Sequence, residues 1–173
     1  MRNVLILSVA VGTACTGSTG TSARPRAGTI SVEWTGRLRG SFSAPATARW
    51  CAADTLLEVI AVRGDTAVGL TLVASDSVRA EVYAVNQAEN FTPGRPQAGI
   101  ALRMLGEVNL LGFDGMGGKV IVTAGGASVS GTLDARLRPV SSSDTLQLKG
   151  WFEQIPVAPA TGVCGRANKP GSG

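Results

Sequence analysis

The chain contains no histidine among its 173 residues, and this removes the most familiar catalytic arrangements. Histidine is the usual general base, and both Ser-His-Asp and Cys-His sites depend on it. The remaining route is a pair of carboxylates, as in glycoside hydrolysis. The acidic residues are isolated, however: Asp65, Asp76 and Asp144 lie at expected turns, and Glu33 and Asp134 lie on the polar side of expected strands. We therefore predict no catalytic residues and no enzymatic activity.

The glycine-rich segment 112–119 invites comparison with a phosphate-binding loop. Phe113 stands where that motif requires its first glycine, and Val120 follows Lys119 where the motif requires Ser or Thr. The segment also leads into an expected strand, so no helix dipole would face a phosphate. We predict instead an irregular connection with several residues at positive φ. Asp114 alone offers too few oxygen ligands for calcium, so no metal or cofactor is predicted.

Cys15 lies where a hydrophobic leader gives way to polar sequence. Met1-Arg2-Asn3 is a short positive start, Val4–Val11 is an apolar run interrupted only by Ser8, and small residues precede the cysteine. A membrane-spanning helix needs about 20 apolar residues, which is far more than this run provides. The segment therefore has the dimensions of a signal-peptide hydrophobic region.

This arrangement resembles a bacterial lipoprotein precursor. The resemblance implies that residues 1–14 are a signal peptide, removed before a lipidated Cys15. It also implies a membrane partner, bound through the lipid on that cysteine. Residues 15–27 then form a flexible linker of Thr, Gly, Ser, Ala, Arg and Pro. Thr16 is not the aspartate associated with inner-membrane retention, which implies an exported protein of the cell envelope, anchored at the outer membrane.

Ordinary secretory cleavage stays open as an alternative. Lipoprotein signals usually carry Leu three residues before the cysteine, and here that residue is Gly12. Gly12 and Ala14 are also the small residues that a secretory signal peptidase favours. Both routes deliver the protein to the envelope, and they differ in whether a lipid holds it there.

The two remaining cysteines, Cys51 and Cys164, are predicted to form a disulfide. An oxidising compartment favours pairing, and the odd count of three cysteines is explained if Cys15 takes the lipid. The bond would tie the start of the predicted domain, residues 28–168, to its end. On the chain-entropy model such a loop contributes about 4–5 kcal/mol. Two independent buried thiols are the alternative.

The dominant pattern that must position these residues has period two. Polar and apolar residues alternate in most segments, and no window of 11 residues shows a helical stripe with caps. Turn residues separate the segments, for example at 63–66 and at Gly125-Gly126, and the segments at 56–62, 68–74 and 78–85 look like a meander of hairpins. The predicted strands are 29–42, 56–62, 68–74, 78–85, 98–105, 120–123, 129–137 and 146–152.

Such short, regularly spaced strands predict an all-β domain, an antiparallel β-sandwich of about eight or nine strands. A small up-and-down β-barrel is the alternative. The chain after Pro156 is predicted to be irregular, and residues 169–173 are predicted to be a disordered tail. The net charge of +4 is scattered along the chain, and the export signal argues against nucleic acid as a partner.

Trp151 is the candidate ligand-binding residue, because it falls on the polar side of its strand between Lys149 and Glu153. An exposed Trp can stack on a sugar or seat an apolar group of a protein partner; packing under the tail is the alternative. Trp34 and Trp50 are predicted to lie in the core. The sequence thus predicts a lipid-anchored, non-catalytic binding or structural module. The alternatives are a lipocalin-like carrier of a small apolar ligand and a carbohydrate-binding module.

Overall fold

The structure is a computed structural model that describes residues 26–92, 94–106, 109–139 and 144–160. The predicted signal peptide, Cys15, Cys164 and the predicted tail 169–173 lie outside the described residues, as does the linker up to residue 25. The elements in chain order are β1 (Thr29–Gly36), β2 (Gly40–Cys51), the 3₁₀ turn η1 (Ala52–Asp54), β3 (Leu56–Arg63), β4 (Thr66–Val73), β5 (Val82–Val85), the 3₁₀ turn η2 (Ala88–Asn90), β6 (Gln97–Leu105), β7 (Leu110–Ala124), β8 (Ser128–Pro139) and β9 (Leu146–Pro159).

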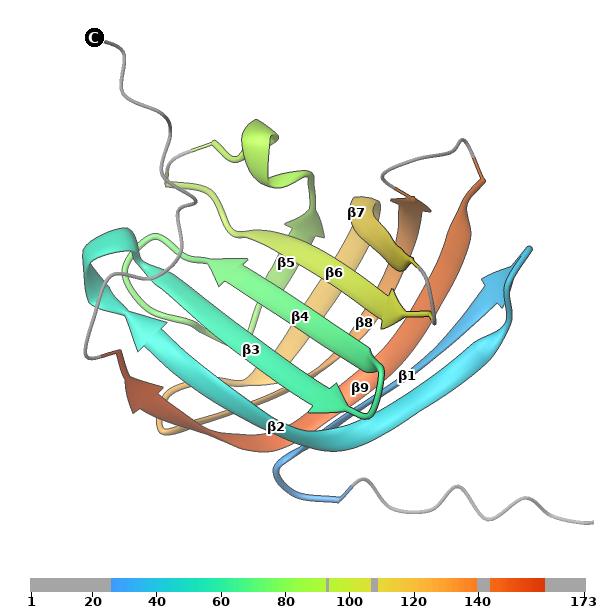
Figure 1. The fold of residues 1–173 in the computed structure, drawn as a ribbon. Helices are drawn as coiled ribbons and strands as arrows, with labels where there is room; N and C mark the ends of the chain where they lie inside the picture. Colours follow the sequence, from blue (N-terminus) through green and yellow to red (C-terminus); the bar gives the residue numbers. More distant parts are fainter. Residues whose placement is uncertain (1–25, 93, 107–108, 140–143, 161–173) are drawn as a thin grey trace, which may run out of the picture.

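All nine strands belong to one sheet that closes on itself (Figure 1). The strand order is β1-β2-β3-β4-β6-β5-β7-β8-β9, and β1 closes the ring by pairing antiparallel with both β2 and β9. The short strand β5 separates β6 from β7 at one end, where it runs parallel to β6. At the other end β6 pairs directly with β7.

The all-β prediction is confirmed, but the preferred arrangement as two packed sheets is wrong. The sheet closes because its long strands bend and change partners. In β9, residues up to Glu153 pair with β1, and Val157 to Pro159 pair parallel with β2. Between these parts lies a bulge, where Gln154 has a φ of 46° and the register against β8 shifts. The closed sheet matches the barrel alternative, although the order β4-β6-β5-β7 is not up-and-down.

The core lies inside the closed sheet and is built from alternate residues of every strand. In β8, Val129, Leu133, Ala135 and Leu137 are buried, while Thr132 is exposed, as the alternation predicts. The buried apolar residues form one continuous cluster. In the described part of the chain, no helix is both long and apolar enough to span a membrane.

Four local predictions are wrong. The predicted single strand 29–42 is a hairpin, in which β1 ends at Gly36 and β2 begins at Gly40 and pairs antiparallel with it. The segment 78–85 is a strand only from Val82 onward, because residues 74–81 leave β4 and form a loop, and β5 pairs with β6 and β7 rather than with β4. The glycine-rich segment 112–119 lies within β7, where a register shift at Gly115/Gly117 absorbs its irregularity. Of its four glycines, Gly118 has a positive φ (121°). Finally, β9 continues past Pro156.

Candidate functional site

The first hollow, here called the mouth, opens at the end of the sheet where β2 and β9 finish. It has a volume of about 290 Å³, and most of its described lining side chains are apolar. Leu57 and Val129 form its inner part and belong to the core. The other lining residues are Trp50, Ser77, Val78, Gly126, Val157 and Pro159. A concave apolar hollow with few polar groups is the usual form of a small-molecule site.

Backbone hydrogen bonds hold the rim of the mouth. The Ala160 amide donates to the Trp50 carbonyl at 2.8 Å, and the Val157 amide donates to the Ala127 carbonyl at 2.9 Å. On the opposite side, the Ala74 amide donates to the Thr55 carbonyl at 3.0 Å and so ties the loop 74–81 to the start of β3. These bonds join segments that are far apart in the sequence.

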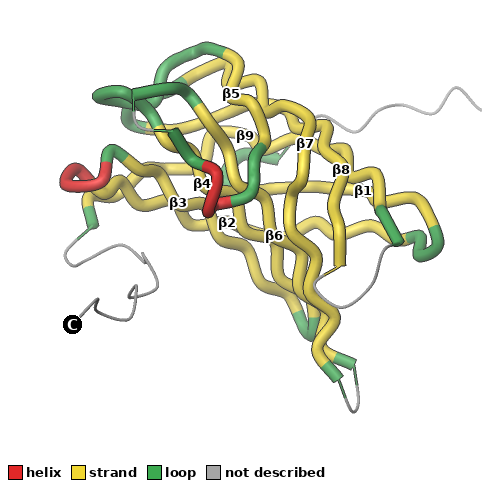
Figure 2. Tube along the Cα trace, turned by 90° about the horizontal axis from the view of Figure 1, so that it is seen from above, coloured by secondary structure: helices red, strands yellow, loops and turns green. Residues whose placement is uncertain are grey.

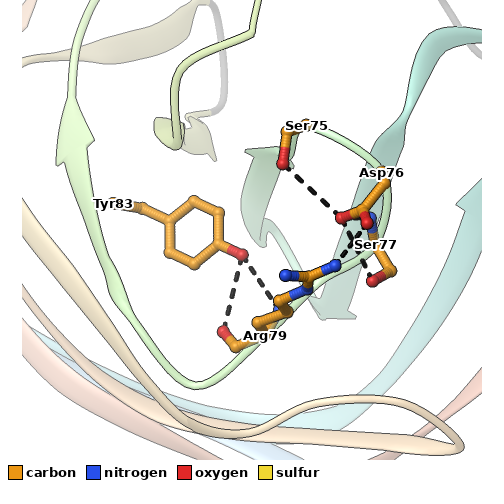
Figure 3. Close-up of polar contacts among 5 residues, drawn as sticks. All are labelled: Ser75, Asp76, Ser77, Arg79 and Tyr83. Carbon is orange, nitrogen blue, oxygen red and sulfur yellow. Dashed lines mark hydrogen bonds and ion pairs between the residues drawn. The ribbon is translucent and has the colours of Figure 1, made fainter.

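Tyr83 fixes the loop 74–81 from inside the sheet (Figure 3). Its ring is fully buried, and its hydroxyl accepts a hydrogen bond from the Arg79 amide at 3.2 Å and donates to the Arg79 carbonyl at 3.5 Å. Burial raises the pKa of the Tyr83 phenol from 10.0 to about 12, and the nearby Glu81 contributes in the same direction. The neutral phenol is therefore the form that supports the loop.

The same loop is also stabilised on its exposed side. The Asp76 carboxylate accepts a hydrogen bond from the Ser77 amide at 2.7 Å and forms an ion pair with Arg79. Both charged side chains are more than half exposed, so the pair neutralises itself in water and projects little field into the mouth.

The second hollow, here called the outer groove, lies on the outside of the sheet over β3, β4 and β6 and has a volume of about 370 Å³. Its floor contains Gly69 and Gly99, where the sheet carries no side chains. The segment around η2 forms one wall, and Figure 2 shows this turn, in red, beside β4 and β6. Ile60, which is 44% exposed, lines the groove on β3.

Two carboxylates of the outer groove take part in ion pairs. Glu58 contacts the Arg49 guanidinium at 2.5 Å, and Asp114 contacts the Arg103 guanidinium at 2.6 Å. The buried Gln97 holds the wall segment, because its amide nitrogen donates to the Thr92 carbonyl at 2.6 Å. The groove is therefore polar, and two of its three described acids are paired with arginines of the same sheet, whereas the third, Glu89, is exposed.

The structure describes two of the predicted site residues, Trp151 and Cys51. Trp151 lies on the outer side of the sheet as its position in the strand predicts, half-buried between Ser31 of β1 and Thr132 of β8. It lines neither the mouth nor the outer groove. Cys51 is buried at the end of β2 with 4% exposure, and its predicted partner Cys164 lies outside the described residues.

The other two tryptophans differ from each other. Trp34 is buried in the core, as predicted. Trp50 is only half-buried and lines the mouth, so its assignment to the core is only partly right. Its position next to the end of a strand was the one signal that could have suggested a rim residue.

Sequence reasoning identified neither hollow. The described residues of the mouth come from five separate segments of the chain. No sequence motif or residue spacing predicts that these segments meet. The outer groove had a weak signal in Gly69 and Gly99, since a glycine inside an apolar strand often marks a close approach or a missing side chain. Among the described residues, no group of three or more Cys, Asp or Glu side chains could hold a metal ion.

Comparison with known proteins leaves the fold and the two hollows as the basis for any functional argument. No family model, no curated protein and no solved structure matches the chain.

Proposed function

We propose that this protein is an exported, lipid-anchored, non-catalytic binding module of the cell envelope. The observation that carries the binding role is a closed, continuous apolar core that opens at the mouth into a hollow of about 290 Å³. Such a hollow can hold a ligand, and in the part of the chain that the structure describes its lining includes no acid or base that could activate one. Two carboxylates of the outer groove support the same view, because Glu58 and Asp114 are paired with arginines.

The anchor part of the proposal rests on the leader sequence and Cys15. The first described residues are compatible with the predicted linker, residues 15–27, which joins the domain at Gly28. Gly28 and Thr29 are already fixed to the sheet, since the Gly28 amide donates to the Glu153 carbonyl at 2.7 Å. A linker between Cys15 and this point would place the domain a short distance from the membrane surface.

Replacing Cys15 by Ser tests the anchor. The variant should move from the membrane fraction to the soluble envelope fraction, while a matched Ser18→Ala variant should stay with the membrane. Thr16→Asp should redirect the protein to the inner membrane. Wild-type protein found in the soluble envelope fraction would instead support ordinary secretory cleavage, and an intact N-terminus on cytosolic protein would refute export.

The Cys51–Cys164 disulfide belongs to the same proposal, and the mouth supplies its support. The Ala160 amide is bonded to the carbonyl of Trp50, the residue before Cys51. The four residues from Ala160 to Cys164 span at most about 14 Å. This limits how far Cys164 can lie from the rim residue Ala160, and the predicted partner Cys51 is next to Trp50 at the same rim. Mass mapping without reduction should find one linked peptide pair, and alkylation of both thiols in unreduced protein would refute the bond.

A carbohydrate-binding role is the second candidate, and the outward position of Trp151 is the observation in its favour. An indole on the outer side of a sheet can stack on a sugar ring. Trp151→Ala should abolish retention on an immobilised polysaccharide if this role is correct. Equal retention of the variant and the wild type would exclude Trp151 as the contact.

A further inference from the structure

We infer that the mouth binds a neutral, predominantly apolar small molecule that packs against the Trp50 indole. This inference rests on the proposed binding function and deepens it by naming the site and the ligand class. It is distinct from the predicted site at Trp151, which lies on the outside of the sheet.

The chemistry of the lining selects a neutral ligand. Among the described residues, no charged side chain lines the hollow, and Ser77 carries the one hydroxyl. An ionised group moved into such a place loses its hydration without gaining a partner of opposite charge. The charged pair in the adjoining loop, Asp76 and Arg79, is already satisfied internally.

The position of the mouth selects an apolar ligand. Leu57 and Val129 are 1% and 0% exposed and belong to the core, and Trp50, Val78 and Val157 pack against that core while only partly buried. The hollow is therefore a continuation of the hydrophobic interior toward solvent. A ligand there would cover the apolar surface that these rim residues leave accessible, and that burial is the driving force for binding.

The rim is also preorganised, which limits the ordering cost of binding. Trp50 is held by the hydrogen bond from Ala160, and Val157 is held by its bond to Ala127. Val78 sits in the loop that the Tyr83 hydroxyl fixes at Arg79. Walls that are ordered before the ligand binds favour a specific binding site over a non-specific hydrophobic surface.

Fluorescence titration with the neutral probe N-phenyl-1-naphthylamine tests the inference. The measurement uses the full-length chain carrying Cys15→Ser, so that no attached acyl chain competes for the mouth. Saturable binding should raise probe emission and quench tryptophan emission. The anionic probe 1-anilinonaphthalene-8-sulfonate should bind about tenfold more weakly or worse, because its charge finds no partner. Absence of saturable binding of the neutral probe would overturn the inference.

Two rim variants, each with the same matched control, locate the site. Val157→Glu and Val78→Glu place a carboxylate at the mouth and should each raise the Kd of the neutral probe about tenfold or more. Val62→Glu makes the same change on the outer face of β3, where the side chain is 63% exposed, and should leave the Kd unchanged. Thermal unfolding identifies a variant that fails to fold, and unchanged affinity in a folded rim variant contradicts the inference.

The source of the tryptophan quenching gives an independent readout. Trp50→Phe keeps an apolar ring, so binding should persist while most of the quenching is lost. Trp151→Phe should keep the quenching. The reverse result would move the probe to the outer face and refute the mouth site. None of these outcomes bears on the fractionation of the Cys15→Ser variant, so failure of the ligand inference and failure of the anchor are distinguishable.

Discussion

The mouth and the outer groove are two hollows of similar volume, and neighbouring residues of one strand line both. Leu57 of β3 faces the mouth, while Glu58 and Ile60 face the outer groove. The mouth is hollow because the strands end there, and its walls are core side chains. The groove is open at Gly69, which leaves its floor without a side chain, whereas the Phe91 ring lies close to Gly99. The two hollows are therefore similar in volume but different in chemistry. The mouth extends the hydrophobic core, whereas the outer groove is a solvated surface that carries ion pairs.

The sharpest way to break this comparison uses one strand. Leu57→Ala removes a side chain that is 1% exposed, and it should lower the free energy of unfolding by about 2–5 kcal/mol. Ile60→Ala, where the side chain is 44% exposed, should cost under about 1 kcal/mol. Urea denaturation of both variants measures the difference. Equal losses would show that the groove residue is as integral to the core as the mouth residue.

Two glycines that line the groove sharpen the comparison further. A Cβ at Gly115 would lie 2.8 Å from the Val85 side chain, so Gly115→Ala should cost about 1–3 kcal/mol. A Cβ at Gly69 would meet nothing closer than the Ala101 Cβ at 3.8 Å. Gly69→Ala should therefore be neutral or stabilising by up to about 1 kcal/mol, because alanine reduces the freedom of the unfolded chain. Thermal melts separate the two, and a destabilised Gly69 variant would argue against an empty groove floor.

Tyr83 tests the loop that walls the mouth. Tyr83→Phe should lower stability by about 1–2 kcal/mol, because the Arg79 amide loses its partner. The pKa of the folded phenol lies above its ordinary value, so the stability it contributes is complete below pH 10.0 and is lost as the pH rises toward about 12. The Phe variant should lack this decline.

This titration can be followed directly, because the chain contains one tyrosine. Tyrosinate absorbance in the folded protein should therefore report Tyr83 alone, with a midpoint near pH 12. A midpoint near 10 in folded protein would mean that the phenol is solvated and that the loop is not held from inside.

The smallest effect is expected at the groove ion pair. Glu58→Gln should cost under about 1 kcal/mol, because the Arg49 side chain is half exposed and water screens the pair. The loss should shrink at high salt. A double-mutant cycle with Arg49→Gln isolates the coupling. A coupling energy several times larger and insensitive to salt would show that water is excluded from the ion pair. The outer groove would then resemble the mouth in its exclusion of water.

The alternation of polar and apolar residues predicted the buried face wherever a strand has one solvent-exposed face and one buried face. The buried series Val129, Leu133, Ala135 and Leu137 follows directly from period two, and so does the outward position of Trp151. The same rule failed at 78–81, where valine and charged residues alternate but the chain leaves the sheet. There, the hydrogen bonds of Arg79 to the buried Tyr83 decide the conformation, and no local pattern encodes them.

The sequence by itself determined that the protein is all-β and which faces of most strands are buried, and it predicts a signal peptide before Cys15. Those properties depend on neighbours along the chain. Only the tertiary structure decided that the sheet closes, that β5 lies between β6 and β7, and that Trp50 meets Val78 and Val157 at a mouth. These depend on hydrogen bonds between distant strands, and strand periodicity specifies which residues face inward without specifying which strand lies alongside.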